Sequence, residues 1–334
     1  MNRRDFMALG ACATAAQCIA APAAKTDLSK LTMEDYEKAV ALIDSTSPED
    51  IVKRKPALEV LQRFIRGVEK GKNYFDFCNA GVKLDAQEVE RVHSTFPALK
   101  WYDHAFDKVL AELKTTNVTG NKPAIWYVYN MGVVVKTKSC AFAIDLCHRK
   151  AAMMVPFLDF AICSHSHGDH YTKEFFGAMG KARKPIATNF RLAKWYCKKD
   201  GEFDYKDLKI RCTEADHNPT FRWAILCSEV TCGTGADAYT LFHSGDCNRH
   251  DHLRPAVKNP DVYFGHCAIG LNFMTVYQTT MPAKLMVPLH HQELGHLAGP
   301  YRCVAYNEEP ASILQGMKQL GAKSVMPVWG DRIV

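Results

Sequence analysis

Four side chains that commonly bind metals lie close together in the motif His165-Ser-His167-Gly-Asp169-His170. Imidazole nitrogens and carboxylate oxygens are ligands of zinc and related divalent metals. Successive residues of an extended segment point to opposite sides, so His165 and His167 should face the same point. Gly168 permits a bend that turns Asp169 and His170 toward a second point. The motif therefore predicts a site for a pair of metal ions, because chance rarely produces this pattern.

The elements on either side of the motif should hold it in place. An apolar strand is expected at 160–163, and Thr172 is expected to cap a helix at 173–179. Residues 26–116 are expected to be helical. Pro56 should break or restart one of these helices. From Pro123 onward, short β-type runs alternate with helices, which predicts a layered α/β domain. The other expected strands are 125–129, 133–136, 140–144, 208–212, 223–230, 239–243, 262–264, 285–287 and 324–327, and the other expected helices are 190–196 and 311–320.

The motif, with an earlier strand that ends in Asp145, resembles the metallo-β-lactamase superfamily. Later landmarks of that family have counterparts in Asp216-His217-Asn218, Ser244-Gly245-Asp246 and Met286-Val-Pro-Leu-His290. The likeness covers about 122–334, which we expect to be the family's domain, and a helical region at 25–121 lies outside it. The resemblance implies an α/β fold, the αββα metallo-β-lactamase sandwich, with an added N-terminal helical segment.

The resemblance also implies a ligand set, in which His165, His167 and His217 bind one metal ion. Asp169, His170 and His290 bind a second ion, and Asp246 lies between the two. Two divalent ions are implied, zinc first, with manganese or iron as alternatives. A water held between such ions yields hydroxide near neutral pH, which can attack a carbonyl or phosphoryl centre. Asp169 then serves as a catalytic residue as well as a ligand, and Asp145 should orient a motif histidine.

Several histidines have an alternative interpretation. His291 and His296 compete with His290 as the last ligand, although the order strand-Pro-x-His favours His290. His296 is also a candidate proton donor or substrate contact, and a structural or solvated histidine is the alternative. His243 and His266 lie in expected strands, so we predict that both are buried and hydrogen-bonded rather than catalytic.

An aspartate at position 246 distinguishes the chain from the zinc β-lactamases, which lack it there. The stretch Asn272-Phe-Met-Thr275 and the ending Pro-Val-Trp-Gly-Asp331 are similar to one branch of the superfamily. That branch contains the ascorbate-6-phosphate lactonase-like proteins and the phospholipase D that hydrolyses N-acyl-phosphatidylethanolamines. The resemblance implies a di-metal hydrolase of a lactone, ester or phosphodiester, acting on a small molecule or lipid. The alternatives are a metal-bearing binding or scaffold protein without catalysis and a β-lactamase-like amidase.

Residues 1–24 resemble a bacterial twin-arginine export signal. Arg3 and Arg4 precede a weakly apolar stretch at 8–20, and Ala21-Pro22-Ala23 offers small residues to a signal peptidase. The apolar stretch is shorter than the ~20 residues that a spanning helix needs, so the mature chain should have no transmembrane segment. We expect export to the periplasm or the extracellular space, and lipid attachment at Cys12 is the alternative.

The composition argues against several classes of protein. The net charge of +6 over 334 residues, without a run of five like charges, does not indicate a nucleic-acid-binding protein. The 13 cysteines form no Cys-x-x-Cys pair, which argues against a zinc ribbon or a redox motif. One or two disulfides are compatible with an oxidising compartment, but the sequence does not assign them. The N-terminal helices could form a dimer surface, so a homo-oligomer stays open.

Overall fold

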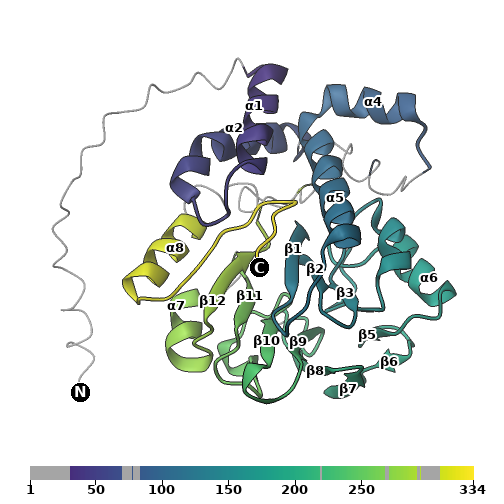
Figure 1. The fold of residues 1–334 in the computed structure, drawn as a ribbon, viewed down its shortest axis with the longest axis vertical. Coiled ribbons are helices and arrows are strands. Elements are labelled where there is room, and N and C mark those ends of the chain that lie inside the picture. Colours follow the sequence, from purple (N-terminus) through teal and green to yellow (C-terminus); the bar gives the residue numbers. More distant parts are fainter. Residues whose placement is uncertain are drawn as a thin grey trace. The chain divides into compact units, whose positions relative to one another are not determined.

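The computed structural model describes residues 31–69, 77, 83–218, 220–267, 271–291, 294 and 309–334. Residues Thr32–Val334 form one compact unit. Figure 1 shows its helices and strands. Within the described part of the chain, no helix is both long enough and apolar enough to cross a lipid bilayer.

Two six-stranded mixed sheets form the centre of this unit. The first sheet runs in the order β1 to β6, antiparallel from β1 to β3 and parallel from β3 to β6. The second runs from β12 to β7, parallel from β12 to β10 and antiparallel from β10 to β7. The strands are β1 (Ala124–Tyr129), β2 (Gly132–Lys136), β3 (Ala141–Ile144), β4 (Phe160–Ile162), β5 (Ile186–Thr188), β6 (Trp195–Tyr196), β7 (Gly201–Tyr205), β8 (Leu208–Ala215), β9 (Ile225–Cys232), β10 (Tyr239–His243), β11 (Val262–His266) and β12 (Leu285–Leu289).

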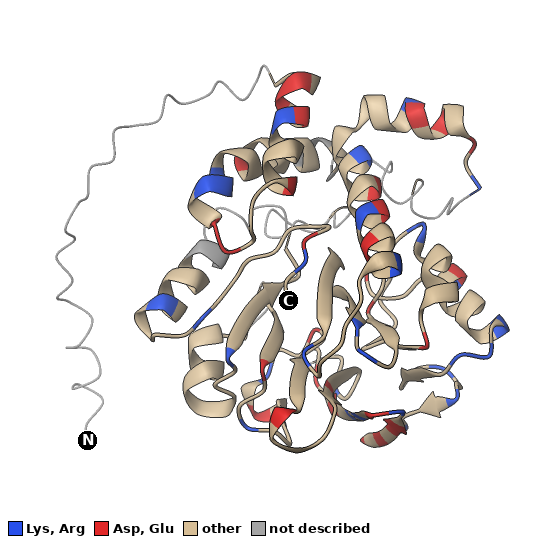
Figure 2. Cartoon of the chain, in the orientation of Figure 1, with Lys and Arg blue, Asp and Glu red and all other residues tan. Residues whose placement is uncertain are grey.

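Helices cover the outer faces of both sheets. Contacts link α5 (Pro97–Thr115) to β1, α6 (Lys173–Lys181) to β5, and α8 (Glu309–Gln319) to β12. The short helix α7 (Phe273–Thr275) packs against α8. Charged residues lie mainly on the outward faces of the helices and in the loops, whereas the strands are mostly uncharged (Figure 2). The predicted αββα sandwich is confirmed.

The added N-terminal helices are α1 (Met33–Asp44), α2 (Ile51–Glu69) and α4 (Ala86–Thr95). All three contact α5, and α1 also packs on α2. The buried side chains of α1 and α2 belong to the same hydrophobic core as both sheets, and α4 packs against this core through half-buried Val89 and Val92. Trp101 and Tyr102 on α5 extend this packing, because their rings lie 4.5 Å from Trp329 and 5.3 Å from Tyr129. Aromatic contacts of this kind bury large apolar areas and so hold the helices to the sheets.

The parallel strands bring the ends of distant segments together. In the first sheet Ile144 pairs with Ile162, so the residues after β3 and β4 lie at the same edge. In the second sheet His243 pairs with Phe264, and His266 pairs with Leu289. The residues that follow β10, β11 and β12 therefore also share one edge, and most of the predicted metal ligands lie in these positions.

Three expectations about elements need correction. The predicted helix at 190–196 is wrong: the segment is irregular and ends in β6, and Leu192 is 85% exposed, so no apolar face is available to support a helix. Pro56 does not break α2, because it lies on the exposed face while the helix is held by its buried face. At 324–327 only Ser324 forms a bridge, with Met286.

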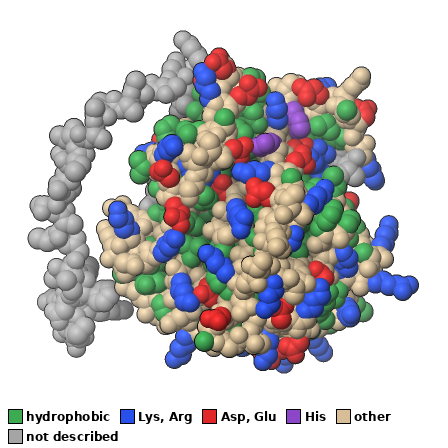
Figure 3. All heavy atoms as spheres, in the orientation of Figure 1, with side chains coloured by type: hydrophobic (Ala, Val, Ile, Leu, Met, Phe, Trp, Pro, Cys, Tyr) green, Lys and Arg blue, Asp and Glu red, His purple; other side chains and the backbone are tan. Residues whose placement is uncertain are grey.

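Acidic and basic side chains are intermixed over the face of the molecule shown in Figure 3. A nucleic-acid-binding surface would instead concentrate Lys and Arg on one face.

Candidate metal centre

The residues of the His165–His170 motif leave the carboxyl end of β4 in a tight loop. The backbone amides of His170 and Tyr171 both bond to the carbonyl of His167, at 3.0 and 2.9 Å, and α6 begins directly afterwards. The Thr172 side chain accepts a bond from the amide of Phe175, which caps α6 as predicted. The loop is thus held between a strand and a capped helix.

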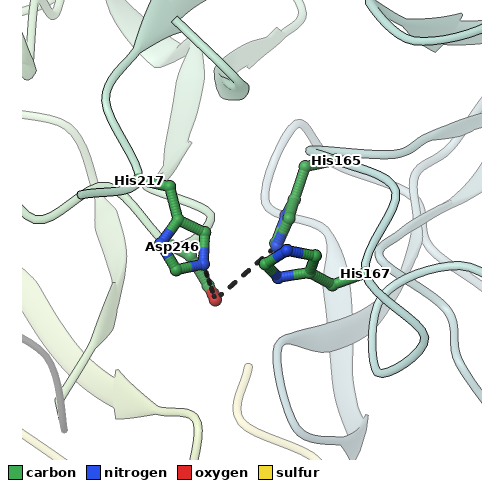
Figure 4. A group of neighbouring side chains, drawn as sticks. All are labelled: His165, His167, His217 and Asp246. Atoms are coloured by element: carbon green, nitrogen blue, oxygen red, sulfur yellow. Dashed lines mark ion pairs between the residues drawn. The ribbon is translucent and has the colours of Figure 1, made fainter. Parts of the chain in front are cut away.

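The first group of candidate ligands consists of His165, His167, His217 and Asp246. One ligand atom from each of them lies within 4.8 Å of all the others. Figure 4 shows the four side chains converging from opposite sides of the site, and its dashed lines join His165 and His217 to the aspartate. The two Nε2 atoms lie 3.7 and 3.4 Å from Asp246 Oδ2. His217 comes from the loop that follows β8, and Asp246 from the loop that follows β10.

A second group, Asp169, His170 and His290, lies next to the first. His290 Nε2 is 3.3 Å from Asp169 Oδ2 and 3.6 Å from Asp246 Oδ2. His170 Nε2 is 3.2 Å from the other oxygen of Asp246. Asp246 thus uses both carboxylate oxygens and lies between the two groups, in the position predicted for it.

Hydrogen bonds behind the site fix the orientation of two imidazoles. Asp145 accepts bonds from the amide and hydroxyl of Ser164, both at 2.6 Å, and from His170 Nδ1 at 2.9 Å. Because the Ser164 hydroxyl donates to Asp145, it accepts from His165 Nδ1, which lies 2.9 Å away. Both histidines therefore carry their proton on Nδ1 and present the lone pair of Nε2 to the site, as metal-binding histidines do. The predicted orienting role of Asp145 agrees with this geometry.

Unusual backbone conformations occur at the residues around the site. Asp145, Asn130 and His290 have positive φ angles of 48°, 58° and 64°, which non-glycine residues rarely adopt. Gly245 has φ 51°, and a Cβ atom there would lie 2.8 Å from Ser164 Cβ. Glycine thus lets the loop carrying Asp246 approach the motif loop closely. Such strain persists where the surrounding structure enforces it, often at functional sites.

The electrostatics of the site favour a cation. Burial opposes charge on His170, but Asp246, Asp169 and Asp145 surround it and raise its pKa well above the usual value. Burial likewise favours a neutral Asp246, yet His170 and His290 hold its pKa well below the usual value. The buried carboxylates therefore favour positive charge within the centre. A divalent cation would satisfy the same carboxylates.

The donor set fits metal ions in a second respect. His165 is 3% exposed, and its Nε2 has no hydrogen-bond partner among the described residues, although burial of an unsatisfied polar atom costs free energy. That nitrogen points to the centre of the first group. A metal ion in the first group would satisfy it.

The structure brings all seven predicted ligands together in these two groups. His296, the predicted proton donor or substrate contact, lies outside the described residues. His243 is buried, and its two nitrogens bond to the Met131 carbonyl and the Gly245 amide, as expected.

Two residues near the centre were not identified from the sequence. His266 is buried as predicted, but its ring stacks on His290 at 3.8 Å and its Nε2 lies 3.9 Å from Asp246 Oδ1, so it borders the centre. Its position at the end of β11, beside the ends of β10 and β12, was the available signal. Asn130 donates to Asp169 Oδ2 at 3.0 Å, and no motif in the sequence marks it.

One side of the centre is exposed in the described part of the chain. His167 is exposed, whereas His170 and His290 are fully buried. Phe221 lies beside this opening: its ring is 6.1 Å from that of His167 and 6.2 Å from that of His217, and the residue is 53% exposed. An apolar side chain thus borders the exposed side of the candidate ligands.

No protein-family model and no curated protein matches the sequence. Among solved structures, the metallo hydrolase Igni18 from the archaeon Ignicoccus hospitalis is 14% identical, with a TM-score of 0.50; the match covers 63% of this chain and 97% of Igni18. A possible metal-dependent hydrolase from Veillonella parvula is 13% identical over 64% of this chain and 99% of its own, with a TM-score of 0.47. The isothiocyanate hydrolase from Delia radicum gut bacteria is 16% identical over 63% and 98%, with a TM-score of 0.44. The two-sheet architecture and the likeness to Igni18 show that this chain has the fold of the metallo-β-lactamase superfamily.

Proposed function

We propose that the protein is a metal-dependent hydrolase with two divalent ions, zinc in the first place, that cleaves a lactone, ester or phosphodiester. One observation carries this proposal: two groups of ligand atoms meet at a single buried carboxylate, Asp246. His165, His167 and His217 would hold one ion, and Asp169, His170 and His290 the other. Such a pair, when bound, acidifies a shared water and stabilises negative charge on the reacting carbonyl or phosphoryl group.

The chain's own residues would supply orientation around these ions. Asp145 and Ser164 fix the tautomers of His165 and His170, so neither ring needs to reorganise during the reaction. Asn130 donates to Asp169 and restricts its carboxylate to one position. The opening at His167 admits the substrate, since the deeper ligands are buried.

Phe221 favours a substrate with an apolar part. Its exposed ring lies 6.1 and 6.2 Å from the rings of two candidate ligands, His167 and His217, so a substrate bound at the metals would pass beside it. An acyl chain or the apolar face of a lactone could lie against this ring while its polar group reaches the metals, which agrees with the small-molecule or lipid substrate proposed from the sequence.

The test is an assay of the full mature chain against lactone, phosphodiester, carboxylic ester and β-lactam panels, with and without a chelator. We expect turnover of a lactone, an ester or a phosphodiester that chelation abolishes and added zinc, manganese or iron restores. Turnover of β-lactams alone would instead favour the amidase alternative. No chelator-sensitive turnover from protein that holds two metals would favour the binding or scaffold alternative.

Replacing the shared carboxylate tests the site directly. Asp246→Asn removes the charge between the two groups, so we expect the bound metal, measured by elemental analysis, to fall below two ions per chain and turnover to fall by at least ~100-fold. Asp251→Asn is the matched control, because Asp251 follows the same strand but is exposed and pairs only with Arg249. Equal metal content in the two variants would remove Asp246 from the site.

We also propose that the protein is exported through the twin-arginine route. Arg3-Arg4 and Ala21-Pro22-Ala23 support this proposal. In a bacterial host with that route, Arg3→Lys together with Arg4→Lys should retain the uncleaved precursor in the cytoplasm. Fractionation and intact-mass measurement would detect this, and unchanged processing of the double variant would contradict it.

A further inference from the structure

Two cysteine thiols meet where the first sheet faces the edge of the second. Cys197 directly follows β6, the last strand of the first sheet, and its amide bonds to the Thr188 carbonyl at 2.8 Å. Cys212 lies in β8, opposite Gly201 of β7. Both thiols are free and buried. Because Cys197 lies at the edge of the first sheet and Cys212 lies in the second, a bond between them would join the two sheets.

Gly201 leaves room for the side chains of Cys197 and Cys212 to lie next to each other. A Cβ atom at this position would lie 2.8 Å from Cys197 Sγ, which is closer than two such atoms can approach. Residues paired across an antiparallel ladder carry their side chains on the same face, so the missing side chain of Gly201 would lie beside that of Cys212. The Cys197 thiol therefore occupies the space next to Cys212 that any other residue at 201 would fill.

We propose that Cys197 and Cys212 form a disulfide that ties the first sheet to the second. The oxidant is a disulfide of the thiol-exchange class, such as an oxidised low-molecular-weight thiol or a thiol oxidoreductase. The Cys197 thiolate attacks one sulfur of this oxidant and releases the first thiol. The Cys212 sulfur then attacks the mixed disulfide and releases the second. Two protein thiols lose two electrons, the oxidant gains them, and two protons pass to the released thiolates.

The environment of Cys197 suits the attacking role. The adjacent Cys212 side chain lowers the pKa of Cys197, which increases its thiolate fraction. Cys197 is itself 2% exposed, but Tyr196 before it and residues 198–200 after it are exposed. A small local movement of these exposed residues would let the oxidant reach the Cys197 sulfur.

A second pair of cysteines provides an internal comparison. Cys227 and Cys247 are 1% and 0% exposed, and they lie in the core of the second sheet. Their thiols donate to the carbonyls of Ser244 and Arg249 rather than to each other. Cys227 lies between buried residues of β9, and Asn248 after Cys247 is half-buried, so an oxidant should reach this pair more slowly in the folded protein.

The experiment is differential alkylation of the folded full chain. The protein is incubated with oxidised glutathione or with a phosphine reductant, unfolded in the presence of an alkylating reagent, digested and analysed by mass spectrometry. We expect a cross-linked peptide containing Cys197 and Cys212, lighter than its two thiol peptides by two hydrogen atoms. Cys227 and Cys247 should be alkylated as free thiols. Alkylation of both Cys197 and Cys212 after oxidation, or a bond from either to another cysteine, would overturn the proposal.

Thermal unfolding gives a second readout. The oxidised protein should melt roughly 5–10 °C above the reduced protein, because the disulfide restricts the unfolded chain. Cys197→Ala should remove this dependence on reductant. The control Cys232→Ala changes a cysteine that is also buried in the second sheet, and it should keep the dependence. A reductant-dependent melting temperature that persists in Cys197→Ala would assign the effect to another pair and contradict the proposal.

Discussion

At the scale of single residues, Asp145 orients two candidate ligands, His170 directly and His165 through Ser164, although it is not itself a candidate ligand. It is fully buried and accepts bonds from Ser164 and His170. Asp145→Asn keeps the shape but replaces one acceptor oxygen by a donor, so His170 would lose its fixed tautomer. We expect metal affinity to fall by about 10–100-fold, measured by competition with a chromophoric chelator.

Asp159→Asn is the matched control for this change. Asp159 also accepts a backbone bond in the first sheet, from Ala141, and it lies just before β4, at the end of that strand away from the motif. Its replacement should affect the unfolding midpoint and leave metal affinity unchanged. Equal losses of affinity in both variants would indicate a general effect of weakening the sheet.

The seven candidate ligands could be identified because each is a residue type with a distinctive chemistry near a strand end. The sequence did not predict the roles of Ser164 and Asn130 or the position of His266 beside the centre. Serine, asparagine and histidine in a strand have many common uses in proteins, so their residue type alone indicates no role. Their roles depend on contacts between residues far apart in the chain, such as Asn130 with Asp169. The sequence likewise did not indicate which cysteines lie close together. Cys212 lies near Cys197 because the register of β7 with β8 places it opposite Gly201, which is next to the Cys197 sulfur.

His148 makes stability depend on pH. Its ring is stacked between Tyr102 and Phe106, at 3.8 and 4.2 Å, and burial lowers its pKa to about 3. In the unfolded chain a histidine has a pKa of about 6.5. Between these values the unfolded chain binds the proton and the folded chain does not, so stability is full above pH 6.5 and is lost as the pH falls toward 3.

We expect this loss to reach about 2 kcal/mol at pH 5 for His148 alone. His148→Gln cannot titrate, so its free energy of unfolding, measured with urea, should fall less between pH 7 and pH 5 than that of the unmodified protein. Parallel curves for His148→Gln and the unmodified protein would contradict this account.

At the scale of elements, α6 carries the motif loop at its N-terminus. The Thr172 cap bonds to the Phe175 amide, and α6 also packs on the first sheet through Phe175, Phe176 and Met179. Thr172→Ala leaves that amide without its partner and should destabilise the protein by about 1 kcal/mol. Urea unfolding measures this loss. Thr172→Ser keeps the hydroxyl and should restore most of it; equal losses would show that the methyl group, not the cap, matters.

Caps and apolar strands were the elements that the sequence predicted well. Thr172 was predicted to cap the helix that follows the motif, and it bonds to the Phe175 amide there, because local side-chain chemistry specifies such a cap. The prediction of a helix at 190–196 was wrong because it relied on the apolar residues of the segment, whereas the pairing of Ala187 with Trp195 favours a strand. Local propensity yields to pairing when a neighbouring strand offers backbone bonds.

At the scale of the whole molecule, one buried ion pair links the added helices to the C-terminus. Arg54 of α2 forms two bonds of 2.8 Å with Asp331, and the two side chains are 1% and 4% exposed. Arg54→Leu leaves the carboxylate buried and unpaired, so we expect a loss of roughly 3–5 kcal/mol in the free energy of unfolding.

The control for this prediction is Lys323→Leu. Lys323 pairs with Glu49 at 2.7 Å, but both side chains are 60% exposed, and such pairs contribute about 1 kcal/mol or less. The double variant Arg54→Leu with Asp331→Leu removes both charges and should recover part of the loss. Similar unfolding midpoints for Arg54→Leu and Lys323→Leu would show that the buried pair contributes little.

The same ion pair has a consequence for the order in which the protein is made. Its partners are 277 residues apart, so Arg54 leaves the ribosome long before Asp331 is synthesised. The Asp331 carbonyl also accepts from the Tyr127 amide, at 2.9 Å, which ties the last residues to β1. Helix α2 and strand β1 therefore complete their bonding only after residue 331 has left the ribosome. Nascent chains stalled before residue 331 should remain open to proteases.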